Sequence, residues 1–291
     1  MRIRRVSILA SLCTLGNALC GFMAITLTAK ALVVSGTAHA TFQGQVRWAA
    51  YFVLLAMVLD ALDGRLARFA RATSDFGGQL DSLCDAVSFG VAPAFLMNRL
   101  VVEGLQDVDL PFGVGRVLWL AWVCGAVYLG CTLIRLARFN VENVHDEEAH
   151  LSFKGLPSPA AAGALVSLII VLVNCWQEVE PGAFACAMLW ALPIVAAVLG
   201  LLMVSNLRYL HLLNQFVRGR RPLGHLVLVL LAIAMAFLLR EVFLPLGFGA
   251  YSLSGPVMHV YRKFARPRGP KAGEGPGGPG PAGAPPPAGR M

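Results

Sequence analysis

Long apolar stretches recur along this chain and restrict the folds that it can adopt. Hydrophobic residues make up 57% of its 291 residues and charged residues only 14%, whereas soluble domains carry about 25% charged residues. A helix needs about 20 predominantly apolar residues to cross a bilayer. Inside the bilayer, a helix satisfies all of its own backbone hydrogen bonds. The sequence therefore predicts an all-α, polytopic bundle of transmembrane helices.

We expect about eight spans, of which six form a core and two follow it. Their approximate bounds are 11–34, 47–67, 77–99, 116–138, 158–175, 184–204, 223–239 and 242–261. Pro245, Gly247 and Gly249 interrupt the last of them. The chain then becomes rich in proline and glycine without apolar periodicity, which is typical of disorder. The expected organisation is a transmembrane domain over 1–265 and a disordered tail over 266–291.

Four carboxylates stand at the ends of two of these spans, in the stretch DALDGRLARFARATSDFGGQLDSLCD. Asp60 and Asp63 are three residues apart and Asp81 and Asp85 are four apart, so each pair lies on one face of its helix. An ionisable group in a membrane segment costs about 2.5–3.5 kcal/mol at the helix centre and marks a functional site by default. Four carboxylates around one point repel one another unless cations lie between them. Oxygen-only ligands suit Mg²⁺ or Mn²⁺, and two such ions can clamp a diphosphate.

The residues between the two pairs fit a phosphate ligand. Gly64 follows Asp63 directly, and Gly77 precedes Asp81 by four residues. A missing side chain at each position lets a ligand approach the backbone. Arg68 supplies a planar fork of donors that suits phosphate. The alternative, solvated or salt-bridged helix ends, is disfavoured by the dense spacing and the apolar flanks.

This stretch resembles the CDP-alcohol phosphatidyltransferase family. It matches the family signature at every fixed position, as Asp60-x2-Asp63-Gly64-x2-Ala67-Arg68-x8-Gly77-x3-Asp81-x3-Asp85. The family transfers a phosphatidyl group from a CDP-linked lipid to an alcohol and releases CMP. The resemblance implies that two divalent cations are bound by Asp60, Asp63, Asp81 and Asp85, and that Asp85 is also the general base. It further implies that the CDP site is lined by Gly64, Ala67, Arg68 and Gly77.

Further segments resemble the phosphatidylserine synthase branch of that family, in its integral-membrane form. They are TLGNALCGF (14–22), SLCDAVSFGVAPA (82–94), RLARFNV (135–141), FKGLPSPAAA (153–162), LMVSNLRY (202–209) and YSLSGPV (251–257). The reaction implied is CDP-diacylglycerol plus L-serine giving phosphatidylserine plus CMP. A homodimer is implied by the resemblance alone.

The metal chemistry by itself does not name the acceptor alcohol, and glycerol 3-phosphate, inositol phosphate and choline remain alternatives. Serine would need a cation for its carboxylate, and Arg135, Arg138 and Lys154 are the cytoplasmic-side candidates outside the signature. The alternative for the two arginines is an anchor that snorkels to the membrane surface. Asn17, within the first span, is either a contact between helices or a substrate contact.

The arrangement of charge predicts orientation. Lysine and arginine gather in alternate loops, which places the N-terminus, the C-terminus and the four aspartates on the cytoplasmic side of the cell (inner) membrane. The net charge of +8 is thus assigned to topology and anionic lipid headgroups, with no nucleic-acid partner expected. A cation transporter with acids in broken helices is the alternative from another class, but it would need acids near the midplane of the bilayer.

Overall fold

The computed structural model describes most of the chain. The described residues are 2–34, 39–70, 75–105, 113–142, 155–176, 183–207, 209 and 240–265. The predicted seventh span, 223–239, and the predicted tail, 266–291, lie outside them.

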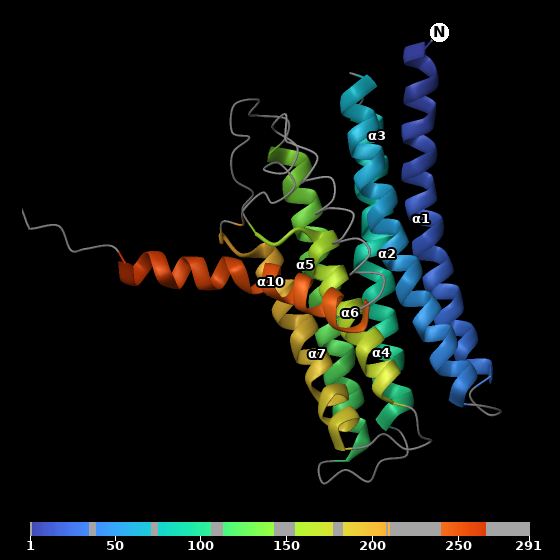
Figure 1. Ribbon diagram of the computed structural model, residues 1–291, viewed down its shortest axis with the longest axis vertical. Coiled ribbons are helices and arrows are strands. Elements are labelled where there is room, and N and C mark those ends of the chain that lie inside the picture. Colours follow the sequence, from blue (N-terminus) through green and yellow to red (C-terminus); the bar gives the residue numbers. More distant parts are fainter. Residues whose placement is uncertain are drawn as a thin grey trace, which may run out of the picture.

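All regular structure in the described residues is helical, as predicted. The elements are α1 (Arg2–Val34), α2 (His39–Ala70), α3 (Asp75–Asp85), the π-helix η1 (Ala86–Val91), α4 (Ala92–Leu105), α5 (Val114–Glu142), α6 (Ser158–Cys175), α7 (Ala183–Val204) and α10 (Arg240–Ala265). In Figure 1, α1 to α7 run side by side along the long axis of the molecule.

Six helical segments in the described residues are long and apolar enough to cross a membrane, and they confirm the predicted six-span core. They are Ser11–Ala31, Thr41–Gly64, Phe76–Leu105, Gly115–Val141, Ser158–Cys175 and Phe184–Val204. The third combines α3, η1 and α4 into one continuous crossing. The fifth, α6, is the most enclosed, with 72% of its residues buried. Small residues in its first turns, such as Ala161 and Gly163, allow neighbouring helices to approach closely.

The π-helix begins immediately after Asp85, and neighbouring helices stabilise it. The Ala92 N–H donates to the Val87 carbonyl, five residues earlier. The buried Tyr128 hydroxyl of α5 donates to the Phe89 carbonyl at 2.9 Å. π-helical segments are rare and frequently occur at functional sites. Here one lies directly beyond a predicted catalytic carboxylate.

The last predicted span, 242–261, is a helix in the structure but is not a candidate membrane crossing. It forms α10, which is not among the described segments that are apolar enough to cross a membrane. It runs across the bundle instead of along it (Figure 1). The reason is composition: two prolines lie within the helix, and serines and glycines lower its hydropathy. Phe248 of α10 packs on Gly163 of α6, so α10 lies close to the end of the bundle where α6 begins.

Candidate active site

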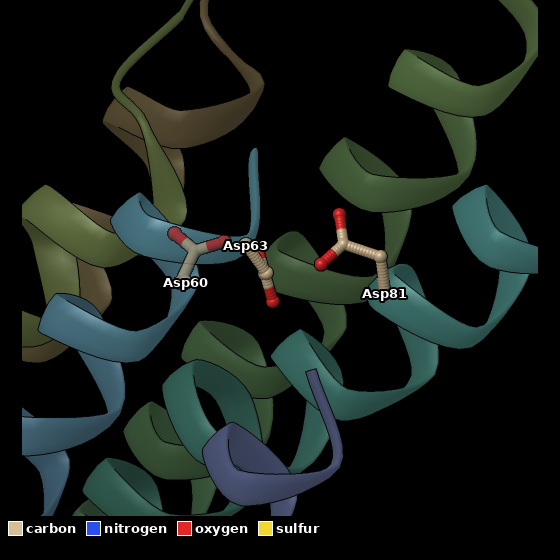
Figure 2. A group of neighbouring side chains, drawn as sticks. All are labelled: Asp60, Asp63 and Asp81. Atoms are coloured by element: carbon tan, nitrogen blue, oxygen red, sulfur yellow. The ribbon is translucent and has the colours of Figure 1, made fainter. Parts of the chain in front are cut away.

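Three of the four predicted metal ligands meet between two helices. Asp60 and Asp63 project from the end of α2 and Asp81 from α3, and one carboxylate oxygen of each lies within 4.8 Å of the other two. Figure 2 shows the three carboxylates gathered in the space between α2 and α3. The i, i+3 spacing on α2 explains why its two carboxylates share a face. The antiparallel return of the chain brings α3 beside them.

The chemistry of this cluster fits a divalent cation. Asp63 is only 5% exposed, and Asp60 and Asp81 are partly buried. Two buried oxygens, Asp63 Oδ2 and Asp81 Oδ1, have no hydrogen-bond partner among the described residues. A buried charged oxygen without a partner costs several kcal/mol of desolvation. Carboxylate oxygens are also the ligands that Mg²⁺ and Mn²⁺ prefer, so the residues present suit such an ion.

Asp85, the fourth predicted ligand, lies one turn beyond Asp81 and outside this group of three. It is 7% exposed. Its Oδ1 accepts a hydrogen bond of 2.9 Å from Nδ2 of Asn17, on α1. Asn17 is completely buried, and its backbone carbonyl accepts a 2.8 Å hydrogen bond from the Ser88 hydroxyl of η1. Asn17 therefore links α1 to the segment that carries Asp85. A contact between helices is one of the two roles considered for this residue from the sequence.

A second residue of α1 touches the cluster. The Thr14 side chain hydrogen-bonds to Asp63, and Thr14 is 7% exposed. Thr14 and Asn17 are three residues apart, so a single face of α1 reaches both helices that carry the carboxylates. The sequence interpretation overlooked Thr14. Its i, i+3 relation to a polar residue in an apolar span was the signal that could have indicated it.

The predicted CDP-site residues flank the cluster, at the end of α2 and the start of α3. Gly64 is exposed, and a Cβ placed on it would have no atom within 4 Å. Gly77 lies in the first turn of α3. Ala67 and Arg68 belong to the end of α2, and their side chains lie outside the described part of the structure. The open space beside Gly64 is consistent with a ligand close to the backbone.

Comparison with protein families agrees with this geometry. The family model for CDP-alcohol phosphatidyltransferase matches residues 7–202, a range that contains all four aspartates, Asn17 and Thr14. The chain belongs to the CDP-alcohol phosphatidyltransferase family.

Relatives within this family cover most of the chain. A CDP-diacylglycerol–serine O-phosphatidyltransferase of Helicobacter pylori is 34% identical over 214 residues, which are 73% of this chain and 80% of that protein. The protein of the same name from Methanocaldococcus jannaschii is 30% identical over 207 residues, 71% of this chain and 76% of that protein. The one from Bacillus subtilis is 32% identical over 155 residues, 53% and 71% of the two chains.

Two of the three predicted acceptor-side cations of this phosphatidyltransferase, Arg135 and Arg138, lie on α5. Arg135 Nη1 donates to the Ser158 hydroxyl at 2.7 Å, and its charge interacts with those of Asp60 and Asp85. One turn further along, Arg138 Nη1 donates to Asn206 Oδ1 at 3.4 Å. Lys154 lies outside the described residues. Arg135 thus extends inward toward the carboxylates, which favours a role in the site over a role as a surface anchor.

Proposed function

We infer that this chain transfers the phosphatidyl group of CDP-diacylglycerol to L-serine, giving phosphatidylserine and CMP. The observation that carries this inference is the convergence of Asp60, Asp63 and Asp81 within 4.8 Å, in a family of phosphatidyltransferases. Serine is the acceptor named for relatives that are 30–34% identical over more than two thirds of the chain. The segments that resemble the serine branch point to the same acceptor.

We propose that Asp60, Asp63, Asp81 and Asp85 hold two divalent cations, Mg²⁺ or Mn²⁺. When bound, such ions neutralise the diphosphate and stabilise the charge that develops on the transferred phosphoryl group. The protein contributes four carboxylates fixed on two packed helices, with Thr14 holding Asp63 from α1. The unpartnered oxygens of Asp63 and Asp81 support this assignment.

Asp85 is the proposed general base. Because Asn17 occupies its Oδ1, Oδ2 is the oxygen that takes the proton from the serine hydroxyl. The serine oxygen then forms a bond to the lipid-side phosphorus, the bond from that phosphorus to the CMP oxygen breaks, and CMP leaves. A positioned base of this kind contributes about 10²- to 10⁴-fold to a rate. Asn17 does not contact substrate in this proposal; it positions Asp85.

The remaining predicted site residues divide between the two substrates. Gly64, Ala67, Arg68 and Gly77 form the CDP side in our proposal, where the backbone beside Gly64 is open. The acceptor side is formed in this proposal by Arg135 and Arg138 of α5, together with Lys154. Of these, Arg135 is the one described next to the carboxylates.

We propose that the active site faces the cytoplasm. The chain is a multi-pass membrane protein with six candidate spans among its described residues, and its sequence carries lysine and arginine mainly in alternate loops, including the one between Asp63 and Asp81. The positive-inside rule places those loops, with both termini, on the cytoplasmic side of the cell (inner) membrane. There a soluble serine can meet a lipid-anchored CDP donor. A homodimer is proposed from family resemblance.

The acceptor is tested by competition. Purified protein in liposomes containing CDP-diacylglycerol and Mg²⁺ or Mn²⁺ is given labelled serine together with glycerol 3-phosphate, inositol phosphate or choline. We expect phosphatidylserine as the main lipid product and an equal amount of CMP. Preference for glycerol 3-phosphate would contradict serine as the acceptor while leaving phosphatidyl transfer intact. Cation flux without any lipid product would instead favour the transporter alternative.

A further inference from the structure

Three segments that are far apart in the sequence meet at the start of α6. The Gly155 N–H donates to the Leu207 carbonyl at 2.8 Å, and the Leu156 N–H donates to the Leu202 carbonyl at 3.0 Å. Gly155 has a positive φ of 88°, and a Cβ there would lie 2.2 Å from the Met203 carbonyl oxygen. Only glycine permits this close connection. The start of α6 is thereby fastened to the segment that follows α7.

The third segment is α10, which docks on the other two. The Tyr209 hydroxyl donates to the Ser252 carbonyl at 3.1 Å. Gly255 lies so close to the Tyr209 ring that a Cβ would approach its Cζ to 2.4 Å, and Phe248 packs on Gly163 in the same manner. Ser252 is 4% exposed. These contacts hold one face of α10 against α6 and Tyr209.

This docking brings Tyr251 to the active site. Its ring centroid lies 5.8 Å from that of Tyr209, and it lies near enough to Arg135 for the guanidinium to favour the ionised form of its phenol. Arg135 in turn donates to Ser158 and interacts with Asp85. Tyr251 and Asp85 are therefore neighbours of the same arginine. Tyr251 begins the segment YSLSGPV (251–257), which resembles the serine branch, but the sequence alone did not place it near Asp85, 166 positions earlier.

We propose that Tyr251 and Arg135 together bind the carboxylate of the acceptor, so that α10 determines the preference for an amino-acid alcohol. This inference rests on the function proposed above and deepens it. A guanidinium and a phenol offer donors of two kinds to one carboxylate. The acceptor hydroxyl then lies on the side of Asp85, which takes its proton.

The chemistry of α10 supports a donor at this position. Burial raises the pKa of the Tyr251 phenol above its ordinary value of about 10, although the positive charge of Arg135 opposes this shift. The phenol is therefore protonated at neutral pH and able to donate. Burial also raises the pKa of Tyr209, to about 12, so that Tyr209 keeps the proton with which it holds Ser252.

The test is the full-length enzyme with Tyr251→Phe, which removes one hydroxyl and keeps the ring that packs on Tyr209. Serine and ethanolamine serve as acceptors, because ethanolamine is serine without its carboxylate. We expect the KM for serine to rise about tenfold or more, the effect of losing one hydrogen bond to a charged group. The preference for serine over ethanolamine should fall by the same factor. The KM for CDP-diacylglycerol should stay within about twofold.

Tyr261→Phe is the matched control, since it makes the same change on the same helix at a side chain that is 67% exposed. It should leave all three quantities unchanged. An unaltered serine KM in Tyr251→Phe overturns the inference, and so does an equal rise for serine and ethanolamine. If the wild-type enzyme makes no phosphatidylserine, the proposed function fails. If the wild type uses serine and the KM for serine is unchanged in Tyr251→Phe, only the proposed role of Tyr251 is rejected.

Discussion

The hydrogen bond between Asn17 and Asp85 offers a quantitative test of how α1 serves the site. Asn17→Ala removes the donor that lies 2.9 Å from Asp85 Oδ1. The contact between Ser88 and the backbone carbonyl of residue 17 does not depend on that side chain. The substitution therefore deletes one hydrogen bond to the proposed base and leaves the attachment of η1 to α1 in place.

The expected magnitude follows from the charge and burial of the two groups. A hydrogen bond to a charged group contributes about 1.5–3 kcal/mol, and both Asn17 and Asp85 are buried, so water cannot replace the lost donor. At about 1.36 kcal/mol for each tenfold change in rate, kcat should fall by about 10- to 150-fold.

The assay is phosphatidylserine formation in liposomes, with kcat and both KM values determined for each variant. Thr28→Val is the matched control on the same helix. Thr28 is 1% exposed, but its hydroxyl donates to the Ala24 carbonyl within α1 and not to the site. The control should retain the wild-type kcat. Full activity of Asn17→Ala would contradict this prediction, because it would show that Asp85 needs no donor from α1.

Three further outcomes follow from the structure. Asp85→Asn should lower transfer by at least about 10²-fold, while CDP-diacylglycerol binding should fall less than turnover; normal turnover would place the base elsewhere. Gly21→Val should lower thermal stability in detergent, because even a Cβ at residue 21 would lie 2.5 Å from the Ser88 hydroxyl oxygen; an unchanged melting temperature would contradict this packing. Truncation after Arg266 should preserve insertion and activity, since the removed segment has no apolar periodicity, and an inactive but inserted product would disprove this.

The sequence indicated the helical core correctly because membrane crossing leaves a clear signal. Six apolar stretches of about 20 residues were enough to predict the six candidate spans. The i, i+3 and i, i+4 spacing of the aspartates predicted their shared faces, and the structure brings Asp60, Asp63 and Asp81 together. These features are local, so they can be recognised without knowing the tertiary arrangement.

The features that the sequence did not indicate depend on contacts between distant segments. Asn17 and Asp85 are 68 positions apart, and no periodicity in either helix pairs them. The π-helix after Asp85 depends on support from α1 and from Tyr128 of α5. The transverse course of α10 arises because its mixed composition is too polar for a crossing, although its apolar residues resembled a span. The role proposed for α10 rests on its packing against α6 and Tyr209, which its sequence does not indicate.

The most direct test of the account is the dependence of serine transfer on the metal ligands. Phosphatidylserine and CMP formation are measured for the wild type and for Asp81→Ala with Mn²⁺, with EDTA, and after Mn²⁺ is restored. Mn²⁺ binding to the same samples is measured by electron paramagnetic resonance. The account predicts metal-dependent, reversible activity in the wild type, with both turnover and tight Mn²⁺ binding lost in Asp81→Ala. Full wild-type turnover in EDTA, or an active Asp81→Ala variant, would contradict it.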